Sequence, residues 1–559
     1  MFITEVVSKR KGKSYTSILL RESFRVGKKI KSKTLGVLTH LPAHVLQAIR
    51  RALKEPTADS LAQLASGSAG ALRMRNGESF GGVWLADQLA TQLEIKKALG
   101  VTREAELSYW QVLGRVLRPG SSLLGLVRLA TTCAAAALLG WRRSFTEDDH
   151  YANGAWLEGR HAVIERRLWE SRTDRSGDQL FLYDVTSSYM EGECNALAHW
   201  GHNRDGKKNK KQVVVGLLTD ERGEPVSTQV YRGNTSDLKT FASQVHKVKR
   251  EFGCTAVTMV GDRGMIRKEQ REEALDAGFH FITALSKPEI ETLLKKNVCQ
   301  LGLFEDQLAE VIEGSDRYLL RRNPVRQEEI AASRQQKKKS LEEALQKANT
   351  YLADHRRAKL KTQRRKFAAK LERSGLSGWL SLHAKNKRLE LNTDQEALTQ
   401  GSRLDGCYVV RTDLKPEQAP AQAVHDRYKD LAKVERDFRT LKSGHLEFRP
   451  WFVCKEENTQ AHALTSMLAL KVRRRLEKAW WPIEVTVEEG VRELENWRVM
   501  ELIHPETQAV VSRQVPEPNA RQKELLDALG LSVPTTVPEA KVTVGTRKKI
   551  NEERKPLVK

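Results

Sequence analysis

The run Leu180-Phe181-Leu182-Tyr183-Asp184-Val185-Thr186 is apolar and β-branched, which predicts a buried strand that carries one acid, Asp184. A second acid, Asp262, follows the apolar run that ends at Val260-Gly261. A third, Glu435, lies on a charged segment of helical character that starts at Tyr428. Any one of these acids alone is more often a turn or cap residue. Together they predict a shared acidic site.

The surrounding periodicity is that of a mixed α/β layer. Apolar and alternating runs predict strands, and apolar residues three and four apart predict helices. The expected order is strand 179–190, strand 211–219, strand 225–232, helix 237–252, strand 255–261, helix 267–277 and strand 279–285. We therefore predict an α/β fold with a ribonuclease H-like catalytic core, a mixed sheet with flanking helices.

The balance of charge is strongly basic. The 559 residues include 95 Lys and Arg against 71 Asp and Glu, a net charge of +24. This excess favours a polyanion as partner through counterion release, although a ribosome-associated or membrane-surface protein would share it. The hydrophobic fraction of 40% is enough for real cores and excludes a disordered chain.

Cysteine usage and hydropathy indicate the compartment. The six cysteines are scattered without a CxxC pair, so they indicate neither a disulfide framework nor a zinc ribbon and fit a reducing cytoplasm. Cys194, His199 and His202 are too few for a structural zinc site and are interpreted as loop residues. No secretory signal is seen, and the apolar stretch 129–139 is too short to span a bilayer, so we expect no membrane partner.

Changes of pattern along the chain predict seven segments. We expect a basic β-hairpin module at 1–57, a linker at 58–78, a helical domain at 79–172 that is a candidate for binding DNA ends, the first part of the core at 173–290, a charged helical insertion at 291–405, the completion of the core with the Glu-bearing helix at 406–482, and a C-terminal segment at 483–559 with a basic tail, a candidate for dimerisation.

The acid set suits one kind of chemistry. Phosphodiester transfer needs an activated oxygen nucleophile and a neutralised phosphate, and two Mg²⁺ ions about 3.5–4 Å apart supply both. Mg²⁺ prefers carboxylate oxygens and needs no His or Cys. We expect Asp184 to bridge two Mg²⁺ ions, with Asp262 and Glu435 holding one each, and Mn²⁺ as an alternative metal.

Five segments carry a resemblance to a known family. They are YDVTSSY at 183–189, QVVVGLL at 212–218, GNTSD at 233–237, GDRGM at 261–265 and YKDLAKVERDFRTLK at 428–442. Together they resemble the DDE transposases of bacterial insertion sequences, in the sixteen-thirty-four-type branch of the insertion-sequence-four superfamily. The resemblance covers residues 180–470, and the N-terminal hairpin more loosely.

The last acid of that superfamily belongs to a Y-x₂-R-x₃-E-x₆-K signature on a helix. Tyr428, Glu435 and Lys442 occupy three of its places, whereas Leu431 stands where Arg is expected. Residues seven apart return to one helix face, so we expect these three to point together into the site. Arg439, one turn beyond Glu435, is the candidate for the missing guanidinium.

Further DNA contacts are expected around the acids. Arg263 follows Asp262 and is expected to bind a phosphate or pair with a neighbouring acid. The turn at 233–237 either positions substrate through Asn234 or only caps a helix through Ser236 or Asp237. The basic loop after the first acid contributes Lys207 and Lys208.

The resemblance implies a DNA transposase that binds terminal inverted repeats, cleaves the strand and transfers its 3′-OH into target DNA by cut-and-paste. It implies double-stranded DNA and a second copy of the chain, as a homodimer in the synaptic complex, as partners, in the bacterial cytoplasm at the nucleoid. Two alternatives stay open: a ribonuclease H-like structure-specific nuclease, and a transposase-derived DNA-binding regulator without catalysis. The presence of all three acids argues against the regulator.

Overall fold

The computed structural model describes residues 2–10, 13–26, 29–41, 43–54, 73–175, 179–192, 194–207, 209–305, 308–449, 451–504, 507–534 and 536–544. They form two compact units. One comprises the chain up to Leu85, Arg128–Ser144 and Ala479–Gly545. The other includes Ala86–Val127 and Phe145–Lys478 and carries every candidate site residue that is described. Lys208, most of the expected linker and the basic tail at 547–555 lie outside the described residues.

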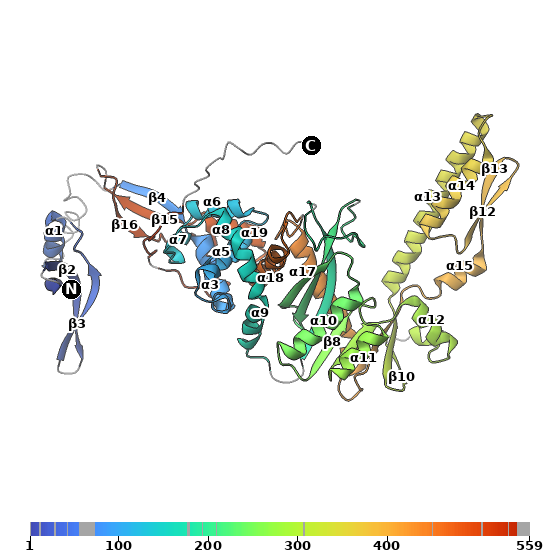
Figure 1. The fold of residues 1–559 in the computed structure, drawn as a ribbon, viewed down its shortest axis with the longest axis horizontal. Helices are drawn as coiled ribbons and strands as arrows, with labels where there is room; N and C mark the ends of the chain where they lie inside the picture. The colour runs from blue at the N-terminus through green and yellow to red at the C-terminus, as the bar shows by residue number, and fades with distance from the viewer. Residues whose placement is uncertain are drawn as a thin grey trace. The chain divides into compact units, whose positions relative to one another are not determined.

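A mixed eight-stranded sheet forms the centre of the second unit (Figure 1). Its order is β10-β11-β14-β9-β8-β5-β6-β7, with β5–β8 and β8–β9 parallel and the other pairs antiparallel. The strands are β5 (Gln179–Tyr189), β6 (Gln212–Asp220), β7 (Pro225–Arg232), β8 (Val257–Gly261), β9 (His280–Ala284), β10 (Ala309–Glu313), β11 (Asp316–Arg322) and β14 (Cys407–Thr412). The predicted mixed α/β layer is confirmed, and its strands from β5 to β9 lie within two residues of the expected bounds.

The strands form where the sequence is apolar because both faces of the sheet are covered. All nine residues of β6 are buried. Phe181, Tyr183 and Val185 share a core with α10 (Asp237–Arg250) and α11 (Lys268–Asp276). Alternation along the strand puts Asp184 on the opposite face.

The sheet continues further than the sequence indicated. β10 and β11 fall inside the segment expected to be a helical insertion, after α12 (Lys287–Lys295) and the short helix η1 (Leu301–Phe304). The part outside the sheet begins at Pro324 and consists of α13 (Pro324–Asp354), α14 (Leu360–Ser374), β12 (Leu380–Lys385), β13 (Arg388–Thr393) and α15 (Gln395–Ser402). We call residues 324–402 the arm.

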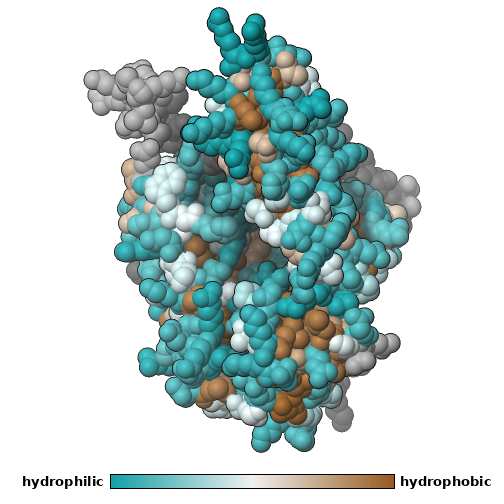
Figure 2. Space-filling model, turned by 90° about the vertical axis from the view of Figure 1, so that its right-hand side faces the viewer, coloured by the Kyte–Doolittle hydropathy of each residue, from teal (hydrophilic) through white to brown (hydrophobic). Residues whose placement is uncertain are grey.

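The arm has a small core of its own. Leu341, Leu352, Phe367, Leu371 and Leu389 are buried together. Pro324 at the first turn of α13, with the Asn323 side chain accepting from Arg326 N at 3.2 Å, starts the long helix. In Figure 2 the arm faces the viewer, and hydrophilic side chains cover its upper end.

The helical segment expected at 79–172 is helical. It consists of α3 (Gly81–Gln92), α4 (Ile95–Leu99), α5 (Arg103–Leu117), α6 (Leu123–Thr132), α7 (Ala135–Leu138), α8 (Glu147–Gly159) and α9 (His161–Glu170). Thr102 and Thr146 cap α5 and α8 through their side chains. Among the described residues, no helix combines the length and the apolar character needed to cross a bilayer.

The first unit contains two further sheets. The N-terminal one has three antiparallel strands where the sequence predicted a hairpin, β1 (Phe2–Arg10), β2 (Lys13–Val26) and β3 (Lys29–Val37), followed by α1 (Ala43–Lys54). The other pairs β4 (Arg73–Ser79) with β15 (Arg498–Ile503) and β16 (Val510–Gln514), near α19 (Val487–Glu495) and α20 (Ala520–Asp527) in the sequence. β4 therefore lies largely in the segment expected as a linker. Its polar sequence does not predict a strand, and pairing with β15 stabilises it, partly through the ion pair between Arg75 and Glu501 at 2.6 Å.

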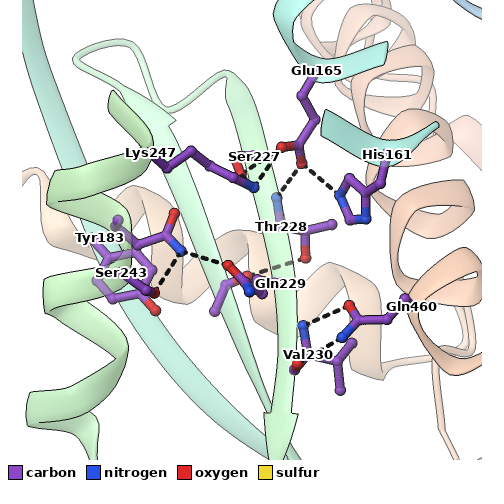
Figure 3. Close-up of polar contacts among 12 residues, drawn as sticks. His161, Glu165, Tyr183, Ser227, Thr228, Gln229, Val230, Ser243, Lys247 and Gln460 are labelled. Carbon is purple, nitrogen blue, oxygen red and sulfur yellow. Dashed lines mark hydrogen bonds and ion pairs between the residues drawn. The ribbon is translucent and has the colours of Figure 1, made fainter. Parts of the chain in front are cut away.

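Side chains satisfy the free edge of β7, the last strand of the main sheet (Figure 3). Glu165 of α9 accepts from Thr228 N at 2.8 Å. Gln460 of α18 (Glu456–Trp480) exchanges two hydrogen bonds with the backbone of Val230. These contacts occupy backbone groups that an exposed edge would offer to another strand.

Glu165 is fully buried and is held by cations. Lys247 lies 2.7 Å from one carboxylate oxygen and His161 lies 2.8 Å from the other. Burial opposes the ionisation of Glu165, yet Lys247 and His161 lower its pKa to about 2. The carboxylate is therefore charged at neutral pH and joins α9, β7 and α10.

We expect Glu165→Ala to lower the free energy of unfolding by about 3–5 kcal/mol, because it leaves Lys247 buried without a counter-charge. Since the folded pKa of Glu165 is below its ordinary value of 4.5, its contribution is complete above about pH 5 and declines as pH falls toward 2. Urea denaturation from pH 7 to pH 3 measures both effects. Glu170→Ala, an exposed acid on the same helix, is the control and should change stability by less than about 0.5 kcal/mol.

Candidate active site

One pair of parallel strands brings two of the three acids together. In the register of β5 and β8, Tyr183 lies opposite Gly261. Asp184 is the next residue of β5 and Asp262 is the first residue after β8, and neighbouring strands lie about 4.8 Å apart. β8 ends at Gly261 whereas β5 continues to Tyr189, so Asp184 lies where the pairing opens.

The third acid arrives on α17 (Leu431–Lys442), which packs against β5 and β6. Its apolar residues recur three and four apart and are buried against the sheet; they are Leu431, Val434, Phe438 and Leu441. Glu435 follows Val434 and is exposed. The apolar spacing therefore determines which way Glu435 faces.

The pKa of Asp184 reflects both its burial and the two other acids. Burial raises the pKa of Asp184 to about 7 by disfavouring its charged form. The Asp262 and Glu435 carboxylates also raise this pKa, whereas the hydrogen bond from Val185 N and the Arg204 guanidinium lower it. Two acids distant in sequence thus lie close enough to Asp184 to repel its charge.

Tyr428 joins the acids from α16 (Ala421–Lys429). Its hydroxyl donates to Oδ1 of Asp262 at 3.2 Å. Burial raises the pKa of Tyr428, and the charges on Asp262 and Glu435 raise it further, whereas Arg263 lowers it. The hydroxyl therefore keeps its proton and serves as a fixed donor to Asp262.

The prediction that one helix carries Tyr428, Glu435 and Lys442 is wrong. A turn at Asp430 separates α16 from α17. Lys442 does not join the acids: its ammonium donates to Ser187 O and to the carboxylate of Asp205. Residues seven apart share one face only within a continuous helix, and Tyr428 lies outside the helix that carries Glu435 and Lys442.

Asp205 connects the loop after β5 to the end of α17. Its carboxylate is 1% exposed and lies 2.9 Å from the Lys442 ammonium. It also accepts from Tyr189 N at 3.1 Å and from the Arg449 guanidinium. Lys442 is thus a positioning residue: it fixes the C-terminal end of the helix that presents Glu435.

Arg204 has a role at the site that the sequence did not predict. Its guanidinium donates to Val185 O at 2.6 Å and to the Asp237 carboxylate at 2.7 Å, and its backbone N donates to Ser187 Oγ. It supplies positive charge beside Asp184 and joins β5 to the first turn of α10. Arg204 lies in a loop whose sequence has no helical or strand periodicity, so no sequence pattern indicates this role.

The other described contact candidates are exposed, as residues that meet DNA must be. They are Arg263, whose backbone N donates to Asp262 at 2.7 Å; Arg439, one turn beyond Glu435; Asn234, in the turn before α10; and Lys207, whose ammonium lies 5.6 Å from the centre of the Tyr189 ring. Ser236 is the N-cap of α10, but its side chain makes no capping hydrogen bond.

The donor chemistry suits a hard divalent cation. In the described part of the chain, no three His, Cys, Asp or Glu side chains are arranged to hold a metal ion as they stand. Burial and the two neighbouring acids nevertheless disfavour the charged form of Asp184 and raise its pKa, and a bound cation would favour that charged form. Carboxylate oxygens are the ligands that Mg²⁺ prefers, so Asp184, Asp262 and Glu435 fit it.

Comparisons with known proteins agree on one family. Residues 175–471, more than half of the chain, match the transposase DDE domain, and residues 3–66 match the N-terminal domain of IS1634 family transposases. A cryo-EM structure of a piggyBac transposase synaptic complex with hairpin DNA is similar at a TM-score of 0.34 and 6% identity, over 77% of this chain and 71% of that chain, a likeness too low to inform the fold. No curated protein matches.

We expect Asp184→Asn to stabilise the metal-free protein by about 2 kcal/mol at pH 8, because it removes a charge that burial and two acids disfavour. The folded pKa of about 7 lies above the ordinary value of 3.8, so the gain declines as pH falls below 7 and disappears near pH 4. Urea midpoints at the two pH values, without divalent cations, test this. Asp276→Asn, which changes an exposed acid at the end of α11, is the matched control. An equal gain at both pH values would contradict the electrostatic origin.

We expect Asp205→Ala to destabilise the protein by about 3 kcal/mol, because it removes the counter-charge of Lys442 and Arg449. Adding Lys442→Met should restore part of this loss, since the unpaired ammonium is then gone. Thermal or urea unfolding of the single and double variants measures the coupling. Strictly additive losses would show that the two side chains act independently.

Proposed function

The chain belongs to the IS1634-type DDE transposases, and we propose that it binds the terminal inverted repeats of an insertion sequence, cuts the DNA strand and joins the freed 3′-OH to target DNA. Family membership makes it a DNA transposase. The observation that carries the finer proposal is the placement of Asp184 beside Asp262 where β8 ends, with Glu435 close enough to raise the pKa of Asp184. The strand order β7-β6-β5-β8-β9, antiparallel and then parallel, supports a ribonuclease H-like core around these acids.

We assign the three acids to a pair of Mg²⁺ ions, Asp184 to both and Asp262 and Glu435 to one each. When bound, the pair supplies an activated oxygen nucleophile and charge neutralisation at the phosphate. Tyr428 keeps the Asp262 carboxylate in one orientation by donating to Oδ1. Arg204 balances part of the negative charge on Asp184.

Basic residues around the acids would hold the flanking phosphates. Leu431 cannot replace the arginine of the family signature, because it is apolar and buried against the sheet. Arg439 is exposed on the same helix as Glu435 and takes that role in our proposal, with Arg263, Asn234 and Lys207 as further contacts. Arginine suits this task because its planar guanidinium binds phosphate through two hydrogen bonds.

We further propose a cut-and-paste route in a synaptic complex of two copies of the chain, since two element ends must be held together. The substrates are double-stranded DNA at the terminal repeats and at the target. The reaction would take place in the bacterial cytoplasm, on DNA of the nucleoid. The net charge of +24 supports tight, salt-sensitive binding of such a partner.

Strand cleavage and joining with purified protein, Mg²⁺ and DNA carrying the element's own ends test the proposal. We expect Asp184→Asn, Asp262→Asn and Glu435→Gln each to reduce cleavage by about 10³-fold or more while end binding survives, because each removes one metal ligand. Glu272→Gln, which changes an exposed acid on α11, is the control and should leave the rate unchanged.

Other outcomes identify the alternatives. Wild-type protein that binds the ends but cuts with neither Mg²⁺ nor Mn²⁺ would be a DNA-binding regulator. Protein that cuts structured DNA without joining it would be a nuclease. Variants that cut as fast as wild type would overturn the site assignment.

A further inference from the structure

The far end of the arm is built from two turns that lie together. One connects α13 to α14 and the other connects β12 to β13. Near the end of α13, the Asn349 side chain donates to Leu389 O at 2.9 Å and accepts from Leu389 N at 2.8 Å. Because Leu389 follows the β12–β13 turn directly, both turns lie at the same end. We call residues 354–390 the arm tip.

The arm tip concentrates positive charge. Twelve Lys and Arg residues and three acids lie between Asp354 and Glu390. Every one of the twelve cations is exposed, and within the described residues none of them forms an ion pair. They are Arg356, Arg357, Lys359, Lys361, Arg364, Arg365, Lys366, Lys370, Arg373, Lys385, Lys387 and Arg388.

Nearer the sheet, three of the six Lys and Arg residues between 324 and 353 pair with acids. Arg326 pairs with Glu329 at 2.7 Å, and Lys338 lies 3.9 Å from Glu342. Arg334 pairs with Asp405, just beyond the arm. A solvated helical face of this kind needs no partner. The tip differs, because its like charges repel one another and only a polyanion would balance them.

The β12–β13 turn retains a lysine at a position that favours glycine. Asn386 and Lys387 connect the paired residues Lys385 and Arg388, with φ of 49° and 61°. These values describe a two-residue turn with both central residues left-handed, for which Asn-Gly is the preferred pair. Lys387 is strained there where glycine would not be, which indicates a use for its charge.

The arm sets a distance between the tip and the acids. α13 starts beside Asp262: Asn323, Arg326, Asp262 and Tyr428 line one cavity of about 330 Å³. Its 31 residues rise 1.5 Å each, so α13 is about 45 Å long. Base pairs of B-DNA rise about 3.4 Å each, so this length corresponds to about 13 base pairs.

We propose that the arm tip binds the phosphate backbone of duplex DNA about 13 base pairs from the phosphate at the acids, without reading its sequence. This deepens the proposed function and rests on it, since the acids must hold one end of the same duplex. An anionic membrane is disfavoured as partner, because the apolar residues of α14, Phe367 and Leu371, are buried in the arm and leave no apolar face to insert.

The test compares two variants, each of which removes four exposed cations. The tip variant is Arg356→Gln, Arg357→Gln, Lys359→Gln and Lys361→Gln together; the control is Lys249→Gln, Arg250→Gln, Lys295→Gln and Lys296→Gln together, at the ends of α10 and α12. Binding is measured without divalent metal, over a range of salt, to mixed-sequence duplexes of about 10 and about 40 base pairs. Equal melting temperatures confirm that both variants fold.

We expect wild type and control to bind the longer duplex more tightly than the shorter one, and the tip variant to lose this difference. The slope of log affinity against log salt should become shallower by about 0.9 for each phosphate that the tip variant no longer neutralises. An unchanged salt slope and an unchanged length dependence in the tip variant would overturn the proposal. It would also be overturned if the tip variant lost binding to phosphatidylserine vesicles while its duplex binding stayed intact. Failure of the wild type to cleave with Mg²⁺ would overturn the proposed function while leaving this binding result readable.

Discussion

The parallel pairing of β5 with β8 is the contact on which the acidic site depends. The register places Asp184 of β5 beside Asp262, the first residue after β8, and a slip of one residue would move one of these acids away from the other. β9 and β14 extend the sheet from β8, and β6 and β7 extend it from β5. The apolar face of α17 packs against the sheet, so Glu435 projects from another side of the helix.

Stability is unevenly distributed around this site. Asp184 is buried beside two like charges, whereas two buried carboxylates elsewhere in the unit are paired with cations: Asp205 with Lys442, and Glu165 with Lys247. These two scaffold carboxylates thus have cationic partners, whereas Asp184 lies beside two further acids, an arrangement common where a charged ligand completes the structure. The binding energy of a cation or a phosphate can then be used at the acids, because the strands and helices that carry them are already fixed.

The central fold was predictable from sequence because β5, β6 and β8 are continuous apolar runs, and such runs predict buried strands without any knowledge of the segments that pack against them. The acids were predictable because they interrupt or follow those runs. Contacts between distant segments were not: β4 is polar and becomes a strand only beside β15, more than 400 residues away, and the turn at Asp430 has no Gly or Pro to mark it. The roles of Arg204 and Lys442 depend on loop geometry, which no periodicity encodes.

The arm leaves the sheet after Arg322 and the chain re-enters it at Cys407, and these two residues are partners in the β11–β14 ladder. Its two ends are therefore already side by side, and a tight turn of a few residues could close β11 and β14 into an ordinary hairpin. The arm is therefore an insertion between two paired strands. A chain built in this way can gain, lose or exchange such a module without re-registering the strands that carry the acids, which makes this junction a natural place to graft a different binding domain.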